Sequence, residues 1–162
     1  MIPAGARVYV VDDDASFVRS ALRLLASWEI QAEGFTSALD FLARGPDVGP
    51  ACALVDLRMP GVNGLDVLEV LVEEGARLPV VLMSGHTDAE SRVAALRSGA
   101  VDFVTKPVAE ERLLAALERA FAEEAEAKDG AARDAGRPDA PPRRPEREHF
   151  EPGGLAEPGF AP

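Results

Sequence analysis

The chain has 162 residues, of which 47% are hydrophobic, and a formal net charge of -11 at pH 7. This composition indicates a soluble protein with one folded core, and the acidic balance argues against a generic nucleic-acid binder, which needs a basic face. No apolar run approaches the ~18 residues that span a bilayer, and the N-terminus lacks the basic stretch and apolar core of a secretory signal. We therefore expect a cytoplasmic protein without a membrane partner. The single cysteine, Cys52, lies in an apolar run and is expected to be a small buried hydrophobe.

Residues 6–125 alternate short apolar runs with amphipathic segments. The apolar runs predict strands at residues 8–11, 30–35, 52–55, 80–83 and 101–104. Apolar residues at helical spacing predict helices at about 15–28, 37–44, 64–74, 88–98 and 109–124. The pattern of the fourth helix rests on Val93, Ala94 and Leu96.

The order of these elements predicts the fold class. Three of the strand runs are apolar at nearly every position, as expected when helices cover both faces of a sheet. Five strand–helix units in about 120 residues predict an α/β protein with a doubly wound parallel sheet and right-handed crossovers.

The composition changes near residue 126. Residues 126–162 contain seven of the 13 prolines and five of the 14 glycines. Their large apolar residues are only Phe150, Leu155 and Phe160, too few to build a core. We predict a folded domain at residues 1–125 and a disordered, charged tail at 126–162. The Pro-Arg-Arg-Pro stretch of the tail allows a docking motif, but a plain solvated tail is favoured.

In an open parallel sheet, the functional site lies beyond the carboxyl ends of the strands. There the sequence has Asp12 and Asp13 after the first strand, Asp56 after the third, Ser84 after the fourth and Lys106 after the fifth. Clustered carboxylates repel one another unless a cation joins them, and a few oxygen ligands beside a phosphate suit Mg²⁺. A carboxylate is also a nucleophile toward phosphorus. The set therefore predicts Mg²⁺-dependent transfer of a phosphoryl group to an aspartate.

Some polar residues near these strand ends have plainer interpretations. Asp14 is expected to cap the first helix rather than to bind a ligand. Ser84, taken alone, is about as well explained as a cap of the following helix. His86 and His149 have no metal-ligand partner at useful spacing, so no zinc site is expected.

The chain resembles the receiver domains of two-component response regulators in Asp12-Asp13 and in the stretches VDLRMPGVNGLDVL, MSGH and GAVDFVTKP. Among receivers, it is most similar to those of the nitrogen-fixation FixJ type and of C4-dicarboxylate regulators. The resemblance covers about residues 6–125. It implies a flavodoxin-like, CheY-like fold of five β–α units with strand order 2-1-3-4-5.

The resemblance also implies the acceptor and the metal ligands. Asp56 is expected to be the phosphorylated residue. Asp13, Asp56 and the backbone carbonyl of Arg58 are expected to hold Mg²⁺, with Asp12 contributing through water. Arg58 and His86 flank the site where family members tune autodephosphorylation, which leaves the lifetime of the phosphoryl group open.

Three further residues are implied to read the phosphoryl group. Ser84 and Lys106 are expected to contact its oxygens, and Phe103 is expected to turn inward when Ser84 moves toward the phosphate. Phe103 alone is more simply a core residue. Lys106 is the only lysine in residues 1–125, and its bond to Pro107 is expected to be cis.

The implied function is a switch rather than an enzyme, with self-catalysed phosphotransfer and slow autodephosphorylation only. Its expected partners are a sensor histidine kinase or phosphotransfer protein and a downstream protein bound by the face of the fourth helix, fifth strand and fifth helix. A phosphorylation-dependent homodimer is a further expectation. Because neither a Gly-rich phosphate loop nor a basic recognition helix is found, we expect a stand-alone receiver without a DNA-binding output domain.

Two other functions stay open at this point. One is an atypical transcription factor that binds DNA through the tail, although the tail has six basic residues against eight acidic ones. The other is a Mg²⁺-dependent phosphatase with an aspartyl nucleophile. That class carries a second acid two residues after the nucleophile, where this chain has Arg58.

Overall fold

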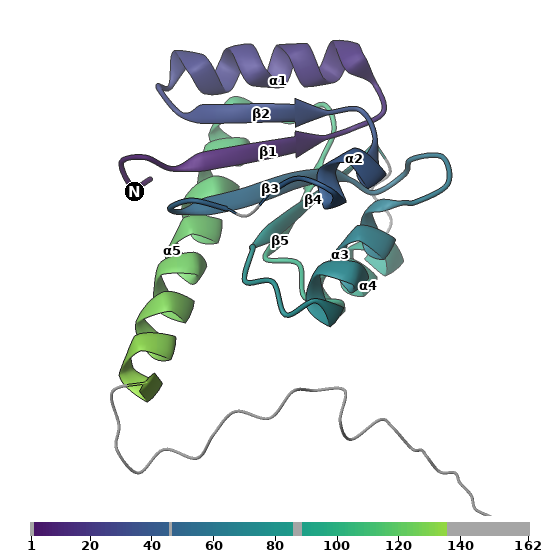
Figure 1. Cartoon of the computed structure of the whole chain (residues 1–162). Helices are drawn as coiled ribbons and strands as arrows, with labels where there is room; N and C mark the ends of the chain where they lie inside the picture. The colour runs from purple at the N-terminus through teal and green to yellow at the C-terminus, as the bar shows by residue number, and fades with distance from the viewer. Residues whose placement is uncertain (1, 46, 86–88, 136–162) are drawn as a thin grey trace, which may run out of the picture. The chain divides into compact units, whose positions relative to one another are not determined.

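The computed structural model describes residues 2–45, 47–85 and 89–135, with side chains up to residue 127. Its centre is a sheet of five parallel strands in the order β2-β1-β3-β4-β5 (Figure 1). The strands are β1 (Arg7–Val11), β2 (Gln31–Phe35), β3 (Ala51–Asp56), β4 (Val80–Ser84) and β5 (Asp102–Thr105). The predicted fold class and strand order are therefore confirmed.

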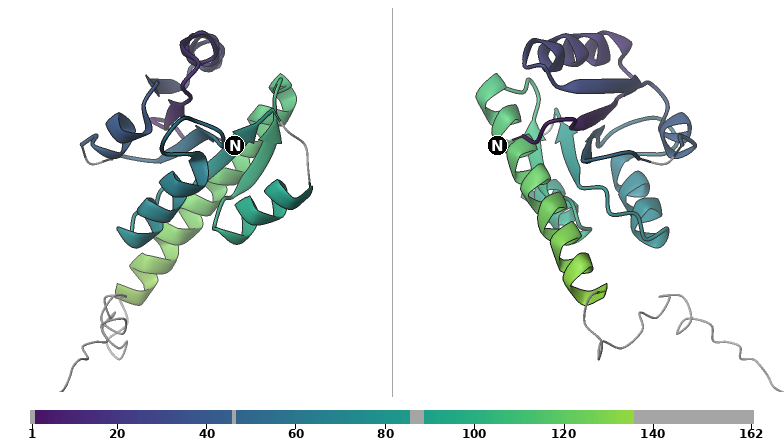
Figure 2. Two further views of the ribbon diagram at one scale, coloured as in Figure 1. Left: turned by 90° about the vertical axis from the view of Figure 1, so that its right-hand side faces the viewer. Right: turned by 60° about the vertical axis from the view of Figure 1, so that its left-hand side comes forward.

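A helix follows each strand, as expected for a doubly wound sheet (Figure 2). The helices are α1 (Ala15–Ser27), α2 (Ala38–Leu42), α3 (Gly64–Glu73), α4 (Ala89–Arg97) and α5 (Glu110–Ala135). Buried residues of α1 and α5 join one hydrophobic cluster, and those of α2, α3 and α4 join another. The two clusters lie on opposite faces of the sheet, since side chains of one strand point alternately to either side.

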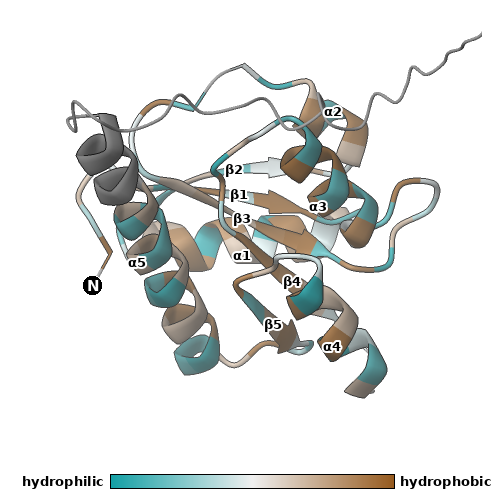
Figure 3. Cartoon of the chain, turned by 90° about the horizontal axis from the view of Figure 1, so that it is seen from below, coloured by the Kyte–Doolittle hydropathy of each residue, from teal (hydrophilic) through white to brown (hydrophobic). Residues whose placement is uncertain are grey.

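The central strands are apolar throughout because helices cover both of their faces. All residues of β3 and β4 are buried, and Figure 3 shows β1, β3 and β4 as mostly hydrophobic. Cys52 lies fully buried in β3 as a free thiol. Burial raises the pKa of the Cys52 thiol, so it stays protonated near neutral pH.

Side-chain caps fix where three of the helices begin. Asp14 accepts hydrogen bonds from the amides of Ser16 and Phe17, which confirms the predicted N-cap of α1. Ser37 caps α2 through the amide of Asp40. Asn63 opens α3 with a reciprocal capping box to Asp66.

The α4 helix packs differently from its sequence pattern. Val93 is 47% exposed and Leu96 is 42% exposed, while Ala95 is the buried residue of this helix. Helical spacing identified the element but not the side that faces the sheet, because a nine-residue helix carries too few apolar residues to define one stripe. The fully buried contact of this helix is therefore the small side chain of Ala95, with Ser91 and Ala94 partly buried beside it.

The α5 helix is longer than predicted. Its predicted end was near residue 124, whereas it continues to Ala135. The added turns are rich in alanine and in charged residues with high helix propensity, and no proline follows Phe121 before Pro138. His86, His149, the Pro-Arg-Arg-Pro stretch and residues 136–162 lie outside the described residues, and the predicted domain boundary stays a prediction.

No helix among the described residues has both the length and the apolar character needed to cross a bilayer.

Candidate functional site

The carboxyl ends of four strands meet at one edge of the sheet (Figure 1). Asp56 and Ser84 are the last residues of the paired strands β3 and β4. Asp12 directly follows β1, and the amide of Lys106, just after β5, donates to the Ser84 carbonyl at 2.8 Å. The parallel topology thus brings together residues that lie up to 94 positions apart in the chain.

Asp12, Asp13 and Asp56 form what we call the aspartate cluster. One carboxylate oxygen from each lies within 4.8 Å of the other two. Asp12 and Asp56 are buried, whereas Asp13 is exposed. Burial and the neighbouring charge of Asp12 raise the pKa of Asp56, an effect that Lys106 only partly opposes. The cluster therefore holds more negative charge than its surroundings compensate.

Lys106 is the cation of this cluster. Its Nζ lies 2.5 Å from Asp12 Oδ2 and 3.3 Å from Asp56 Oδ1. Burial by itself lowers the pKa of Lys106, but the contacts with Asp12 and Asp56 outweigh burial and raise it. Lys106 therefore stays an ammonium ion, shared unequally between two carboxylates.

Close packing holds the end of β3 in place. Gly64, the first residue of α3, donates its amide to the Leu57 carbonyl at 3.0 Å. A Cβ added at Gly64 would lie 2.7 Å from the Asp56 carbonyl oxygen and 2.9 Å from the Leu57 Cα atom. Only glycine fits this contact without displacing the backbone. The start of α3 is thus pressed directly against the residue that carries the central carboxylate.

These residues fit a magnesium ion. Mg²⁺ prefers oxygen ligands and is held by one or two carboxylates with several remaining positions open. The aspartate cluster supplies such oxygens, and its exposed member, Asp13, lies on the solvent side. A single lysine does not neutralise three carboxylates, so a divalent cation would relieve their repulsion.

Ser84 and Phe103 occupy buried positions on neighbouring strands. Ser84 is fully buried at the end of β4, and Phe103 is 1% exposed within the cluster that packs against α2, α3 and α4. The peptide bond between Lys106 and Pro107 is cis, as the resemblance implied.

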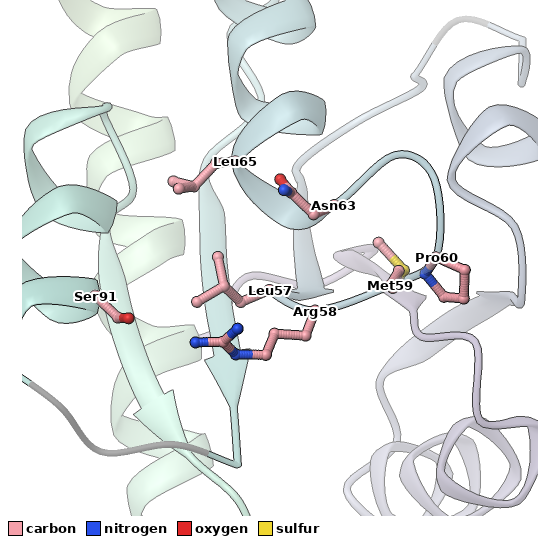
Figure 4. Close-up of a pocket in the computed structure, with 7 residues that line it drawn as sticks. All are labelled: Leu57, Arg58, Met59, Pro60, Asn63, Leu65 and Ser91. Atoms are coloured by element: carbon pink, nitrogen blue, oxygen red, sulfur yellow. The ribbon is translucent and has the colours of Figure 1, made fainter.

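A groove of about 500 Å³ lies beside the end of β3 (Figure 4). Arg58, two residues after Asp56, is exposed, and its side chain extends along the groove toward the side on which Ser91 of α4 lies. The groove is lined by Leu57, Arg58, Met59, Pro60, Asn63, Leu65 and Ser91. A partner that approaches Asp56 from this side would meet Arg58.

Sequence reasoning missed three contacts near the site. The Lys106 Nζ lies 4.4 Å from the ring centroid of Phe17, a residue whose helical spacing marks it only as part of an apolar helix face. Asp102 pairs with Arg112, and its only signal was an acid in an otherwise apolar run. Arg92 of α4 donates to the Phe103 carbonyl at 3.4 Å.

Comparison with known proteins gives close relatives. The response regulator protein TodT of Pseudomonas putida is 40% identical over 114 residues, which are 70% of this chain and 50% of that protein. The transcriptional regulatory protein FixJ of Azorhizobium caulinodans is 36% identical over 125 residues, which are 77% of this chain and 59% of that protein. The chain thus spans about half the length of the curated relatives it matches.

Solved structures of response regulators superpose on this chain. The response regulator StyR superposes with a TM-score of 0.73 and 34% identity, over 82% of this chain and 67% of that one. The FixJ-N structure superposes with a TM-score of 0.69 and 32% identity, over 74% of this chain and 96% of that one. The sequence model of the protein family described as response regulator receiver domain matches residues 8–118 of this chain. The chain therefore belongs to the response regulator receiver domain family.

Proposed function

We propose that Asp56 accepts a phosphoryl group from a histidine kinase or phosphotransfer protein and that the chain acts as a phosphorylation-dependent switch. Receiver domains are phosphoacceptors of two-component systems, interact with histidine kinases and bind Mg²⁺ at an acidic pocket. One observation carries the proposal: Asp56 ends the central strand β3 inside a cluster of three carboxylates that shares one lysine. Family membership favours this function over the phosphatase that the same residues allowed.

In the proposed reaction, the Asp56 carboxylate attacks the phosphorus atom of a phosphohistidine. A P–O bond forms, the P–N bond breaks, and its electron pair stays on the imidazole. Mg²⁺, held by Asp13, Asp56 and the Arg58 backbone carbonyl, with Asp12 through water, would neutralise phosphoryl oxygens. Lys106 lies close enough to Asp56 to pair with a phosphoryl oxygen there, and the Ser84 hydroxyl would donate to another.

The proposed signal leaves through α4, β5 and α5. Phosphorylation would draw Ser84 toward the phosphoryl group, and Phe103, which is already buried, would then be held in its inward position. Val93 and Leu96 of α4 are exposed and available to a partner, and Arg92 of the same helix donates to the Phe103 carbonyl of β5. A downstream protein or a second copy of the chain would bind this face.

We further propose a cytoplasmic location and slow autodephosphorylation. The expectation that the chain works without a DNA-binding domain stays a prediction, because the matched relatives are longer than this chain. DNA binding through the tail concerns mainly residues 136–162, which lie outside those described. Salt-sensitive binding of the full chain to duplex DNA would favour that alternative.

The proposal is tested with acetyl phosphate and Mg²⁺. Wild type should gain one phosphoryl group by intact-protein mass, and hydroxylamine should remove it, as expected for an acyl phosphate. Asp56→Asn should gain none. Asp40→Asn, which changes an exposed aspartate of α2, should be labelled like wild type. Equal labelling of Asp56→Asn, or an unlabelled wild type, would contradict the assignment.

A further inference from the structure

An aromatic ring faces the cation of the site. The Lys106 Nζ lies 4.4 Å from the centroid of Phe17, which is within cation–π range. Phe17 lies in the first turn of α1, is partly buried, and packs against the hydrophobic cluster formed with α5. We propose that Phe17 is a positioning residue for phosphotransfer, which holds the Lys106 ammonium beside Asp56. This inference rests on the proposed function.

The contacts that join Phe17 to Lys106 form a closed circuit through Asp12 and Asp14. Lys106 Nζ donates to Asp12 Oδ2, and Asp12 Oδ1 accepts the amide of Asp14 at 2.9 Å. Asp14 Oδ1 accepts the amide of Phe17 at 3.3 Å, and the ring of Phe17 faces Lys106 Nζ again. The end of β1, the start of α1 and the end of β5 are thereby tied together. The cap of α1 places Phe17 where its ring meets the ammonium.

The aromatic ring of Phe17 matters because the other partners of Lys106 would change during phosphotransfer. In this structure Lys106 is closer to Asp12 than to Asp56. A metal ion or a phosphoryl group at the cluster would compete for these carboxylates. The attraction of the Phe17 ring for a cation does not depend on the charge of the aspartates. Phe17 therefore limits the positions open to a flexible lysine side chain that is 22% exposed.

A purely structural role for Phe17 makes a different prediction, and α1 offers a matched control. Trp28, the C-cap residue of α1, is another partly buried aromatic that packs against the same cluster, and no ring contact joins it to Lys106 among the described residues. Phe17→Leu and Trp28→Leu both replace an aromatic ring with an aliphatic side chain. Only Phe17→Leu removes the ring that faces the ammonium.

The test measures the rate of phosphorylation at saturating acetyl phosphate and Mg²⁺. Phe17→Leu should lower this rate about threefold to tenfold, a range set by the usual strength of cation–π contacts. Phe17→Tyr keeps an aromatic face and should stay within about twofold of wild type. Trp28→Leu should leave the rate unchanged. Equal slowing by Trp28→Leu, or a Tyr variant as slow as the Leu variant, would overturn the assignment.

A double-mutant cycle in urea separates this inference from the proposed function. Phe17→Leu, Lys106→Met and the double variant are unfolded without Mg²⁺ or phosphodonor, and a non-zero coupling free energy is expected. Additive effects would mean that the ring and the ammonium do not interact. If wild type takes no phosphoryl group, the proposed function fails. If wild type is labelled and Phe17→Leu reacts at the same rate, only the role of Phe17 fails.

Discussion

Two acidic side chains buried in the same sheet, Asp56 and Asp102, have opposite electrostatic environments. Both lie beside a cation, and burial alone raises the pKa of either carboxyl. The pKa of Asp102 is nevertheless held below its ordinary value. Arg112 donates to both of its oxygens, at 2.8 and 2.9 Å, and the amide of Phe103 donates at 2.8 Å. The pKa of Asp56 stays raised because the largest influence after burial is the negative charge of Asp12, which Lys106 only partly opposes.

The difference distinguishes a structural acid from a functional one. Asp102 has its own arginine and a backbone donor, so its charge is satisfied within the fold and ties β5 to α5. Asp56 is buried and shares one lysine with Asp12, so its charge is only partly compensated. Such charge costs stability, and it attracts a divalent cation and phosphoryl chemistry. The predictions below test this contrast.

The largest effect is expected at the satisfied acid. Asp102→Ala removes the carboxylate that accepts from the Phe103 amide and pairs with Arg112, and it should lower the free energy of unfolding by about 3 kcal/mol. Urea unfolding measures it. Glu33→Ala is the control, because the Arg7–Glu33 pair is exposed with a distance of 3.9 Å, and should cost less than about 0.5 kcal/mol. Similar costs for the two variants would contradict the distinction between the pairs.

The environment of Asp102 also predicts how its contribution to the free energy of unfolding changes with pH. Asp102 has a folded-state pKa below its ordinary value of 3.8, so its contribution to stability is present above that value. The contribution is lost as the pH falls through the folded-state pKa. The gap between wild type and Asp102→Ala should therefore be constant near neutral pH and shrink below about pH 4. A gap that widens on acidification would reverse the sign.

A smaller effect is expected where α3 presses on Asp56. In Gly64→Ala, the new methyl group would meet the Asp56 carbonyl oxygen and should lower the free energy of unfolding by about 2 kcal/mol. Displacement of Asp56 should also slow labelling by acetyl phosphate. Gly45→Ala is the control, because a Cβ there meets no atom within 4 Å and the glycine has no positive φ. Unchanged labelling of Gly64→Ala would mean that this contact does not position Asp56.

The smallest effect, with the opposite sign, is expected at the unsatisfied acid. Asp56→Asn removes one of three neighbouring charges and should raise the free energy of unfolding by about 1 kcal/mol in Mg²⁺-free buffer. Adding Mg²⁺ should stabilise wild type and have less effect on Asp56→Asn, because the ion binds the folded aspartate cluster. Thermal unfolding with and without Mg²⁺ measures both effects. Destabilisation by Asp56→Asn without Mg²⁺ would place Asp56 among the structural acids.

The sequence by itself determined the order and type of all ten elements within the described residues, with most boundaries within two residues of those observed. Apolar periodicity is a local property, so it identifies strands and helices without tertiary information. Parallel topology then predicts that residues after strand ends meet, which brought Asp12, Asp56, Ser84 and Lys106 to one edge. The cap at Asp14 was readable for the same local reason.

Only the tertiary structure determined which side-chain contacts these residues make. The sharing of Lys106 between Asp12 and Asp56, its contact with the ring of Phe17, and the Asp102–Arg112 pair join residues distant in the chain. Residue type and spacing do not specify such pairs, because side-chain rotamers and the packing of α1 and α5 set them. The exposed side of α4 is likewise set by how this short helix packs on the sheet, because the spacing of its apolar residues defines no single apolar face.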